Sequence, residues 1–522
     1  MRNTLLYSFV FLLVASAKAQ SPNTAIDVQH YTFAIQLNDA NNSISGQTTI
    51  AVKFLKDINS FPIDLIKKNS TGKGMLVSSV IENGKNISFS QSDETLTLSA
   101  AAKTNSEHSY TITYSGVPAD GLIISTNKFG HRTFFGDNWP NRAHNWLPCV
   151  DNPADKAAVD FIVTAPAHYQ VIGNGIKTEE ETLPKDQKLT HWHEIALLPT
   201  KVMVIGAADF AIDQSGDINN IPVYTYVFPE NKVEGFKSYA VAAKILPFFI
   251  NKIGPYAYKK LANVQSKTIF GGMENAGAIF YAENSVGSQG IEELMAHEIA
   301  HQWFGDAVSE KSFAHLWLSE GFATFMANYY LENKYGADSL KKRLSAQREK
   351  VIGFEKGRLT PVVDTLVKAD YMQLLNANSY EKGGWVLHML RRKLGDDVFW
   401  KGIRAYFAKY NGSNANTNDF KNVMAQASGQ NLDVFFKQWL FTAGHPQLAI
   451  SHQYDSAKKT LTLRIDQQQN NLYNVDLEYR IDGKLHTIPI SKKITTIQIT
   501  VQNPTSLVVD PDVNLLASFL IL

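Results

Sequence analysis

The 522-residue chain contains a single cysteine, Cys149, so no intramolecular disulfide is possible and stability must come from burial of a core. Neither sign of charge dominates, since 50 Lys and Arg stand against 49 Asp and Glu. This balance gives no support to nucleic-acid binding and predicts no substrate of one charge sign. Sequence repeats and low-complexity linkers are also lacking. What remains is a globular composition, 44% hydrophobic, whose length predicts about three domains.

Residues 1–19 have the features of an export signal. Arg2 supplies a positive start, residues 5–15 are apolar, and residues 17–19 form an A-x-A cleavage site. The apolar run is shorter than the roughly 20 residues that a membrane span needs. We therefore expect cleavage before Gln20, export to the periplasm or the medium, and no membrane span in the mature chain. An uncleaved N-terminal anchor is the alternative.

Residues 24–210 alternate with a period of two rather than 3.6. Thr48–Phe54, Tyr110–Tyr114 and Val159–Val163 are rich in β-branched and aromatic residues, and turn formers such as Asn83-Gly84 separate such segments. This pattern predicts an N-terminal all-β domain, built as a sandwich or saddle of sheets. Cys149 lies in an apolar setting within it, which favours a buried, unreactive thiol over a nucleophile.

A metal-binding pattern occupies the middle of the chain, where His297-Glu298-Ile299-Ala300-His301 form an HExxH motif. Residues four apart share one face of a helix, so both imidazoles can reach one ion. Glu298 lies about 100° around the helix, close enough to act on a metal-bound water. A catalytic zinc takes three protein ligands and one open position. Glu320, in a second apolar helical segment, is the candidate third ligand, and we expect one Zn²⁺ per chain; a degenerate site without metal is the alternative.

These segments resemble the gluzincin aminopeptidases of family M1. HEIAHQWFGD is followed after the expected gap by WLSEGFATF, which contains Glu320. Upstream, Gly271-Gly272-Met273-Glu274-Asn275 is similar to the exopeptidase motif of the family. Downstream, Tyr380-Glu381-Lys382-Gly383 is similar to the segment that carries its catalytic tyrosine. The resemblance implies a thermolysin-like, α-rich catalytic domain, which we place at residues 211–445.

The resemblance also implies roles for individual residues. Glu274 would bind the α-ammonium group of a peptide with a free N-terminus, and Gly271, Gly272 and Met273 would be further substrate-binding residues. The paired glycines let the backbone approach a bound peptide closely, because they carry no Cβ. Glu298 would act as general base, and the Tyr380 hydroxyl would stabilise the carbonyl oxygen as charge develops on it. Read alone, Gly271–Asn275 could be a glycine turn with a surface glutamate, although its position beside the HExxH motif argues against this alternative.

Three further features leave alternatives open. The aromatic loop 134–153 contains neither Gln nor Glu, the residues with which many relatives hold the amine a second time. Asp137 or Asn138 could substitute for that residue, or Trp139 could shape the pocket; the alternative is that the loop only packs between domains. Asp306 either orients a ligand histidine or lies at the surface. Ser319 stands where the family commonly has Asn, a change that affects support of the ligands and not the ligand set.

From residue 446 the period returns to two, and Asp482-Gly483 marks a hairpin. We expect a small immunoglobulin-like β-sandwich over 446–522 and no C-terminal helical domain of the kind many M1 relatives carry. The cleft would then be more open and admit longer peptides.

Two other functions are alternatives to an aminopeptidase. One is a thermolysin-like endopeptidase, against which Glu274 argues, and the other is a binding module with a vestigial metal site.

Overall fold

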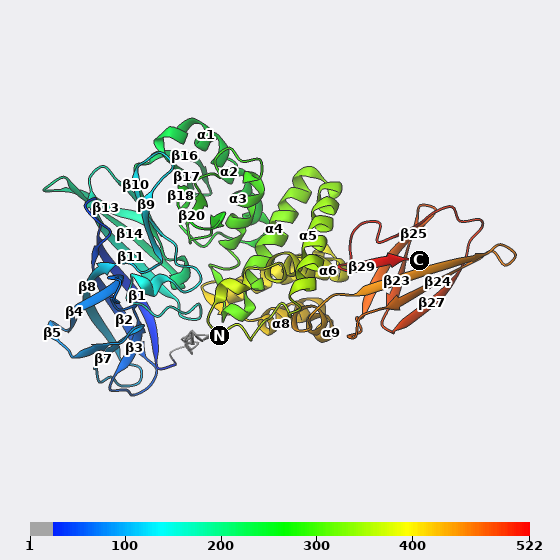
Figure 1. Cartoon of the computed structure of the whole chain (residues 1–522), viewed down its shortest axis with the longest axis horizontal. Helices are drawn as coiled ribbons and strands as arrows, with labels where there is room; N and C mark the ends of the chain where they lie inside the picture. The colour runs from blue at the N-terminus through cyan, green and yellow to red at the C-terminus, as the bar shows by residue number, and fades with distance from the viewer. Residues whose placement is uncertain (1–23) are drawn as a thin grey trace, which may run out of the picture.

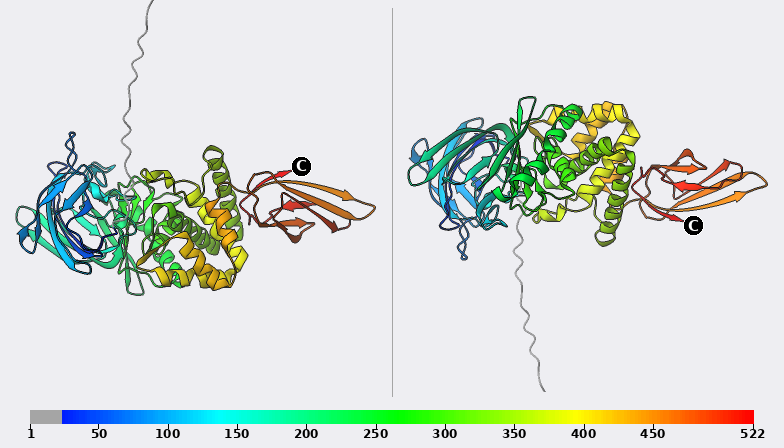
Figure 2. Two further views of the ribbon diagram at one scale, coloured as in Figure 1. Left: turned by 90° about the horizontal axis from the view of Figure 1, so that it is seen from below. Right: turned by 90° about the horizontal axis from the view of Figure 1, so that it is seen from above.

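The computed structural model describes residues 24–522, so the export signal predicted for residues 1–19 lies outside the described part of the chain. Three parts follow one another along the molecule: N-terminal sheets at one end, helices in the middle and C-terminal sheets at the other end (Figure 1). The two views of Figure 2 show the same row from below and from above. This arrangement confirms the predicted fold class of an all-β part, an α-rich part and a small β-sandwich.

An eight-stranded sheet forms most of the N-terminal part, in the order β13-β14-β11-β1-β2-β8-β4-β5. β1 and β11 are parallel, whereas the other neighbours are antiparallel. Alternation buries one face: Phe33 and Phe161 are register partners, both fully buried, with ring centroids 5.2 Å apart. The strands are β1 (Ile26–Gln36), β2 (Ile44–Phe54), β4 (Gly74–Glu82), β5 (Lys85–Asn86), β8 (Glu107–Val117), β11 (Ala157–Pro166), β13 (Ile176–Leu183) and β14 (Gln187–Leu198).

Two smaller sheets complete this part, in the orders β12-β15-β10-β9 and β3-β7-β6. Cys149 is fully buried beside them, and its backbone pairs with Asp64, which confirms the structural interpretation of this thiol. The strands are β3 (Phe61–Asp64), β6 (Phe89–Gln91), β7 (Thr95–Leu98), β9 (Leu122–Thr126), β10 (Arg132–Gly136), β12 (Gln170–Gly173) and β15 (Ile205–Ala208).

The middle part combines a five-stranded sheet, β16-β17-β18-β20-β19, with helices. β17, β18 and β20 run parallel, and the short edge strand β19 runs antiparallel to β20. The strands are β16 (Ala211–Ile218), β17 (Ile221–Val227), β18 (Leu261–Ser266), β19 (Gly272–Met273) and β20 (Ala278–Ala282), with the pair β21 (Val308–Glu310) and β22 (Ser413–Ala415) apart from them. The helices are α1 (Lys232–Tyr239), α2 (Ala242–Ile253), α3 (Ile291–His301), α4 (Trp317–Tyr335), α5 (Ala337–Gly357), α6 (Gly383–Leu394), α7 (Asp396–Tyr410), α8 (Thr417–Ser428) and α9 (Asp433–Phe436).

One predicted helix, over residues 380–394, consists of two pieces. α6 begins at Gly383, and Tyr380 lies in a preceding π-helical turn, η6 (Asn378–Lys382). The Lys382 amide donates to the Ala377 carbonyl at 2.8 Å, five residues back. Such turns are frequent at functional sites because the extra residue redirects a side chain.

The C-terminal part packs a sheet of order β27-β24-β23-β29 against one of order β26-β25-β28, as predicted for a small sandwich. Within the described residues, no helix follows Phe441. Among the helices of residues 24–522, none has the length and apolar character that crossing a membrane requires. The strands are β23 (Gln447–Asp455), β24 (Thr460–Gln467), β25 (Val475–Ile481), β26 (Lys484–Ile490), β27 (Ile494–Thr500), β28 (Leu507–Val509) and β29 (Ser518–Ile521).

Candidate active site

The three predicted metal ligands converge where α3 crosses α4. His297 Nε2 lies 3.1 Å from His301 Nε2, and each of these nitrogens lies 3.2 Å from Glu320 Oε2. Three electron-pair donors this close repel one another unless a cation lies between them. Glu320 and His301 are nearly inaccessible to solvent, which makes the contact costly without a metal.

The spacing and chemistry of these donors fit zinc. Zinc–nitrogen and zinc–oxygen bonds of about 2.0–2.1 Å in a tetrahedron place neighbouring donor atoms roughly 3.3–3.4 Å apart. The observed 3.1–3.2 Å matches that edge length. Two imidazoles and one carboxylate also form the ligand set of catalytic zinc sites that keep a fourth position open. His297, His301 and Glu320 would therefore hold one zinc ion.

His301 is fixed from the side opposite the metal position. Its Nδ1 lies 3.1 Å from the Phe304 carbonyl and 3.0 Å from the Ser319 hydroxyl. Because a carbonyl only accepts, Nδ1 carries the proton and Nε2 is left with its lone pair. Ser319 thus supports a ligand, at the position where the sequence departs from the common residue of the family.

Glu298 is buried next to the ligands, and the edge strand β19 passes close to it. A Cβ on Gly272 would lie 2.3 Å from Glu298 Oε1, so the glycine makes room for this carboxylate. Gly271 has no comparable contact. Gly272 thus leaves room for Glu298, and both glycines also line the cleft, so their role in the approach of a peptide stays a prediction. Burial raises the pKa of Glu298 well above its usual value, and the neighbouring Glu274 and Glu320 carboxylates add to the rise.

Tyr380 reaches the site because η6 packs closely on α4. A Cβ on Gly321 would come within 2.7 Å of Gly383 Cα, and a Cβ on Gly383 within 2.8 Å of Gly321 Cα. The two glycines thus permit the backbone contact that brings η6 to Glu320. The Tyr380 ring stacks on His297 with centroids 5.9 Å apart. Burial, followed by nearby acidic groups, holds the pKa of Tyr380 well above its usual value, so its hydroxyl remains a donor.

Glu274 follows β19 and faces the same space. One of its carboxylate oxygens, one of Glu298 and one nitrogen of His301 all lie within 4.8 Å of one another. Glu274 is 5% exposed, and its Oε1 has no hydrogen-bond partner within residues 24–522. A buried, unpaired carboxylate oxygen is costly, and a bound cationic group would satisfy it.

These side chains line one cleft of about 440 Å³. This size suits a small ligand or the end of a peptide. Every residue predicted for the site contributes to the lining, which consists of Trp139, Phe270, Gly271, Gly272, Met273, Glu274, Gly290, Glu293, Leu294, His297, Glu298, His301, Glu320, Thr324, Ala327, Asn328, Gln347, Lys350, Leu375, Tyr380 and Glu381.

Comparison with known proteins places this site in a family. The model described as "Peptidase family M1 domain" matches residues 238–439, and the one described as "Peptidase M1 N-terminal domain" matches residues 27–202. The chain belongs to peptidase family M1. The predicted resemblance is thus confirmed over both the N-terminal and the middle parts.

Curated relatives of this M1 chain carry aminopeptidase names. "Probable aminopeptidase 1" of Sulfurisphaera tokodaii is 25% identical over 498 residues, which is 90% of this chain and 60% of the relative. "Leucyl aminopeptidase" of Saccharolobus solfataricus is 25% identical over 442 residues, 80% of this chain and 55% of the relative. "Aminopeptidase 2" of Candida albicans is 29% identical over 322 residues, 59% and 35% respectively. The M1 chain therefore spans at most 60% of the length of these three relatives.

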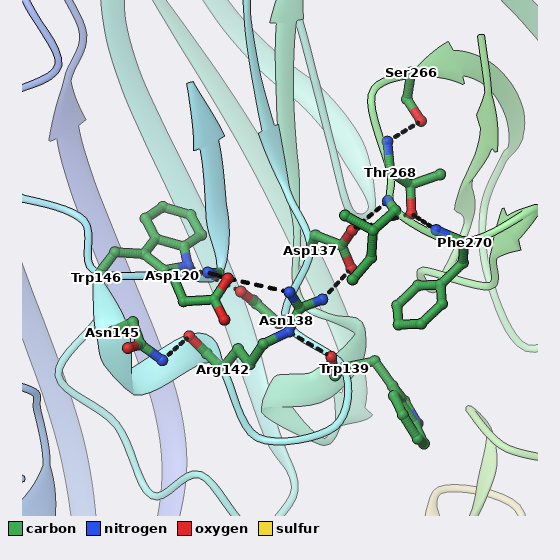
Figure 3. A network of polar contacts seen from close by, with 12 residues as sticks. Asp120, Asp137, Asn138, Trp139, Arg142, Asn145, Trp146, Ser266, Thr268 and Phe270 are labelled. Atoms are coloured by element: carbon green, nitrogen blue, oxygen red, sulfur yellow. Dashed lines mark hydrogen bonds and ion pairs between the residues drawn. The ribbon is translucent and has the colours of Figure 1, made fainter. Parts of the chain in front are cut away.

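The aromatic loop of this M1 chain packs between domains through a polar network around Asp137 and Arg142 (Figure 3), and it also lines the cleft. Trp139 lines the cleft, edge-on to Phe270 with ring centroids 5.9 Å apart. Asp137 and Asn138 instead bind protein atoms: Asp137 pairs with Arg142 at 2.7 Å, and Asn138 accepts from the Trp146 indole at 2.9 Å. Of the three candidates in this loop, Trp139 alone lines the cleft.

Neither alternative for Asp306 holds in this M1 structure. Asp306 is fully buried, and its carboxylate accepts from the Gln302 amide at 2.9 Å instead of contacting a ligand histidine.

The segment after α3 is held by two lysines of the N-terminal part that sequence patterns did not single out. Lys201 pairs with Glu310 at 2.7 Å, both fully buried, and Lys156 donates to the Asp306 carbonyl at 2.9 Å. No local motif marks these contacts, because they join residues more than 100 positions apart.

Proposed function

We propose that this protein is an exported, zinc-dependent aminopeptidase that removes the first residue of peptides. The observation that carries the proposal is the convergence of His297, His301 and Glu320 at 3.1–3.2 Å beside Glu274, whose Oε1 has no hydrogen-bond partner in the described part of the chain. The aminopeptidase names of the M1 relatives support the same activity. The export features of residues 1–19 support secretion, which mass spectrometry would test by finding a mature chain that begins at Gln20.

Glu298 and Tyr380 have different roles in the proposed hydrolysis. Zinc, when bound, polarises the attacking water and the scissile carbonyl. Glu298, buried beside the predicted ligands, takes the proton of that water and passes it to the departing amine. The Tyr380 hydroxyl donates a hydrogen bond to the carbonyl oxygen as negative charge develops there.

The position of Glu274 restricts cleavage to the first peptide bond. In an amino acid, bond lengths of 1.46 and 1.52 Å place the amine nitrogen and the carbonyl carbon about 2.5 Å apart. One carboxylate oxygen of Glu274 lies within 4.8 Å of an oxygen of Glu298 and a nitrogen of His301. An ammonium group bound to that oxygen would therefore bring the first carbonyl next to His301 and Glu298. A second residue would add about 3.3–3.6 Å, which this spacing does not provide.

Replacing the general base tests the proposal. Glu298→Gln keeps the shape of the side chain but cannot accept the proton, so we expect kcat on an aminoacyl anilide to fall by about 10²- to 10⁴-fold. Metal analysis should still find one zinc per chain, because the three ligands are intact. Glu349→Gln, on the exposed face of α5, is the matched control and should keep full activity. Full activity of Glu298→Gln would overturn the mechanism.

A further inference from the structure

Gln302 joins the metal-binding helix to the segment that carries Glu274. It directly follows the ligand His301, at the end of α3, and is fully buried. Its Nε2 donates to the Glu274 carbonyl at 2.7 Å and to the Asp306 carboxylate at 2.9 Å. Its Oε1 accepts from the Gly277 amide at 2.7 Å. One side chain thus holds residues 274–277 at both ends.

The Glu274 carboxylate depends on this hold, because its Oε1 finds no hydrogen-bond partner within residues 24–522. Its place in the cleft is therefore set largely by its backbone. Between the two bonds of Gln302, Asn174 of the N-terminal part donates to the Ala276 carbonyl at 2.8 Å. Asn174 fixes the middle of the segment, whereas Gln302 connects both of its ends to the helix of the predicted metal ligands.

We infer that Gln302 is a positioning residue that sets the distance between the amine anchor Glu274 and the metal ligands, and so determines the preference for a free α-amine. The inference rests on the proposed function and concerns the same site. The backbone fixes the direction of the amide, since the Glu274 carbonyl can only accept from Nε2 and the Gly277 N–H can only donate to Oε1.

The test is Gln302→Met, which keeps the length of the side chain and removes its hydrogen bonds. Steady-state kinetics would use leucine anilide and its des-amino analogue, which lacks the α-amine. We expect KM for leucine anilide to rise about tenfold, the size of effect that weakening one charge-assisted contact produces. We expect kcat to change less, kcat/KM for the des-amino analogue to stay as in the wild type, and zinc to remain at one per chain.

Gln438→Met is the matched control. Gln438 is also buried and also holds a segment at both backbone groups, bonding the amide and the carbonyl of Asn474 at 2.9 Å each. Its loss should lower the melting temperature without changing KM. If Gln302→Met does not fold, Gln302→Asn, with an amide one methylene shorter, is measured in the same way.

Three outcomes separate the two claims. An unchanged KM for leucine anilide in the Gln302 variant overturns the inference. A fall in kcat together with loss of zinc, at unchanged KM, also overturns it and assigns Gln302 to support of the metal helix. Failure of the wild type to hydrolyse every member of a panel of aminoacyl anilides, leucine anilide included, contradicts the proposed function itself.

Discussion

Asp137 shows how a side chain outside the chemistry positions the wall of the cleft. Its Oδ1 pairs with Arg142, and its Oδ2 accepts from the Thr268 hydroxyl and the Ile269 amide at 3.0 Å each (Figure 3). These bonds join the N-terminal part to the loop that ends at Phe270, which faces Trp139. Burial raises the pKa of Asp137, and the Arg142 guanidinium opposes that rise.

We predict that Asp137→Asn destabilises the protein by about 3 kcal/mol, because Arg142 loses a buried counter-charge. The new amide also has only one oxygen, so its NH₂ group must face either the guanidinium or the Thr268 and Ile269 donors. In both orientations one donor faces another donor. Urea unfolding measures the first effect, and faster hydrogen exchange of the Ile269 amide reports loosening of the loop. Asp120→Asn is the control, because Asp120 binds the same arginine but is half exposed. Equal effects of the two variants would contradict this assignment.

For single residues, side-chain contacts could be predicted from the sequence where the partners belong to one local motif. They could not be predicted where the partners lie far apart in the chain. His297 and His301 are four residues apart, so helical geometry alone brings them together. Nothing in the sequence indicates that Asp137 bonds Thr268, 131 residues away, or that Lys201 pairs with Glu310. The wrong interpretation of Asp306 has the same origin, because its burial depends on packing between the domains.

Among the elements, helices with apolar periodicity were predictable, whereas the π-helical turn η6 was not. Its extra residue is accommodated by tertiary contacts: the buried Lys382 donates to Glu355 and to the Gly444 carbonyl, at 2.7 Å each. The 3.6-residue periodicity of apolar positions, from which the helix was predicted, does not indicate such tertiary contacts. η6 therefore places Tyr380 in the cleft through interactions that involve the linker to the C-terminal sandwich.

The helix α6 carries a histidine whose protonation should limit stability in acid. His388 is 4% exposed and bonds Asn514 at 3.1 Å, and burial lowers its pKa from 6.5 to about 4. Between these values the unfolded chain binds the proton and the folded chain does not, so stability falls as pH decreases from 6.5 to 4. The full loss amounts to about 3 kcal/mol.

We predict that His388→Gln, which retains a donor for Asn514, reduces this acid-dependent loss of stability. Urea unfolding at pH 6.5, 5.5 and 4.5 would measure it as a smaller shift of the midpoint than in the wild type. His452→Gln, on the exposed part of β23, should leave the wild-type profile unchanged. A His388 variant with the wild-type profile would show that this residue does not set the acid sensitivity.

Across the whole molecule, the helical middle part lies between the two β parts (Figures 1 and 2). Lys156 and Lys201 reach in from the N-terminal part, and Glu355 of α5 pairs with His445, the last residue before the C-terminal part. The order of three parts was predictable because the period of the sequence changes from two to 3.6 and back. Their mutual contacts were not, since each joins single residues without a repeated pattern.

The central claim is that the cleft hydrolyses only the first peptide bond, at a zinc ion held by His297, His301 and Glu320. The most direct measurement incubates the zinc-loaded protein with one peptide in free and N-acetylated form and follows both by mass spectrometry. We expect residues to be released one at a time from the free amino end, while the acetylated peptide stays intact because Glu274 has no ammonium group to bind. Internal cleavage of both peptides would contradict the account and establish an endopeptidase.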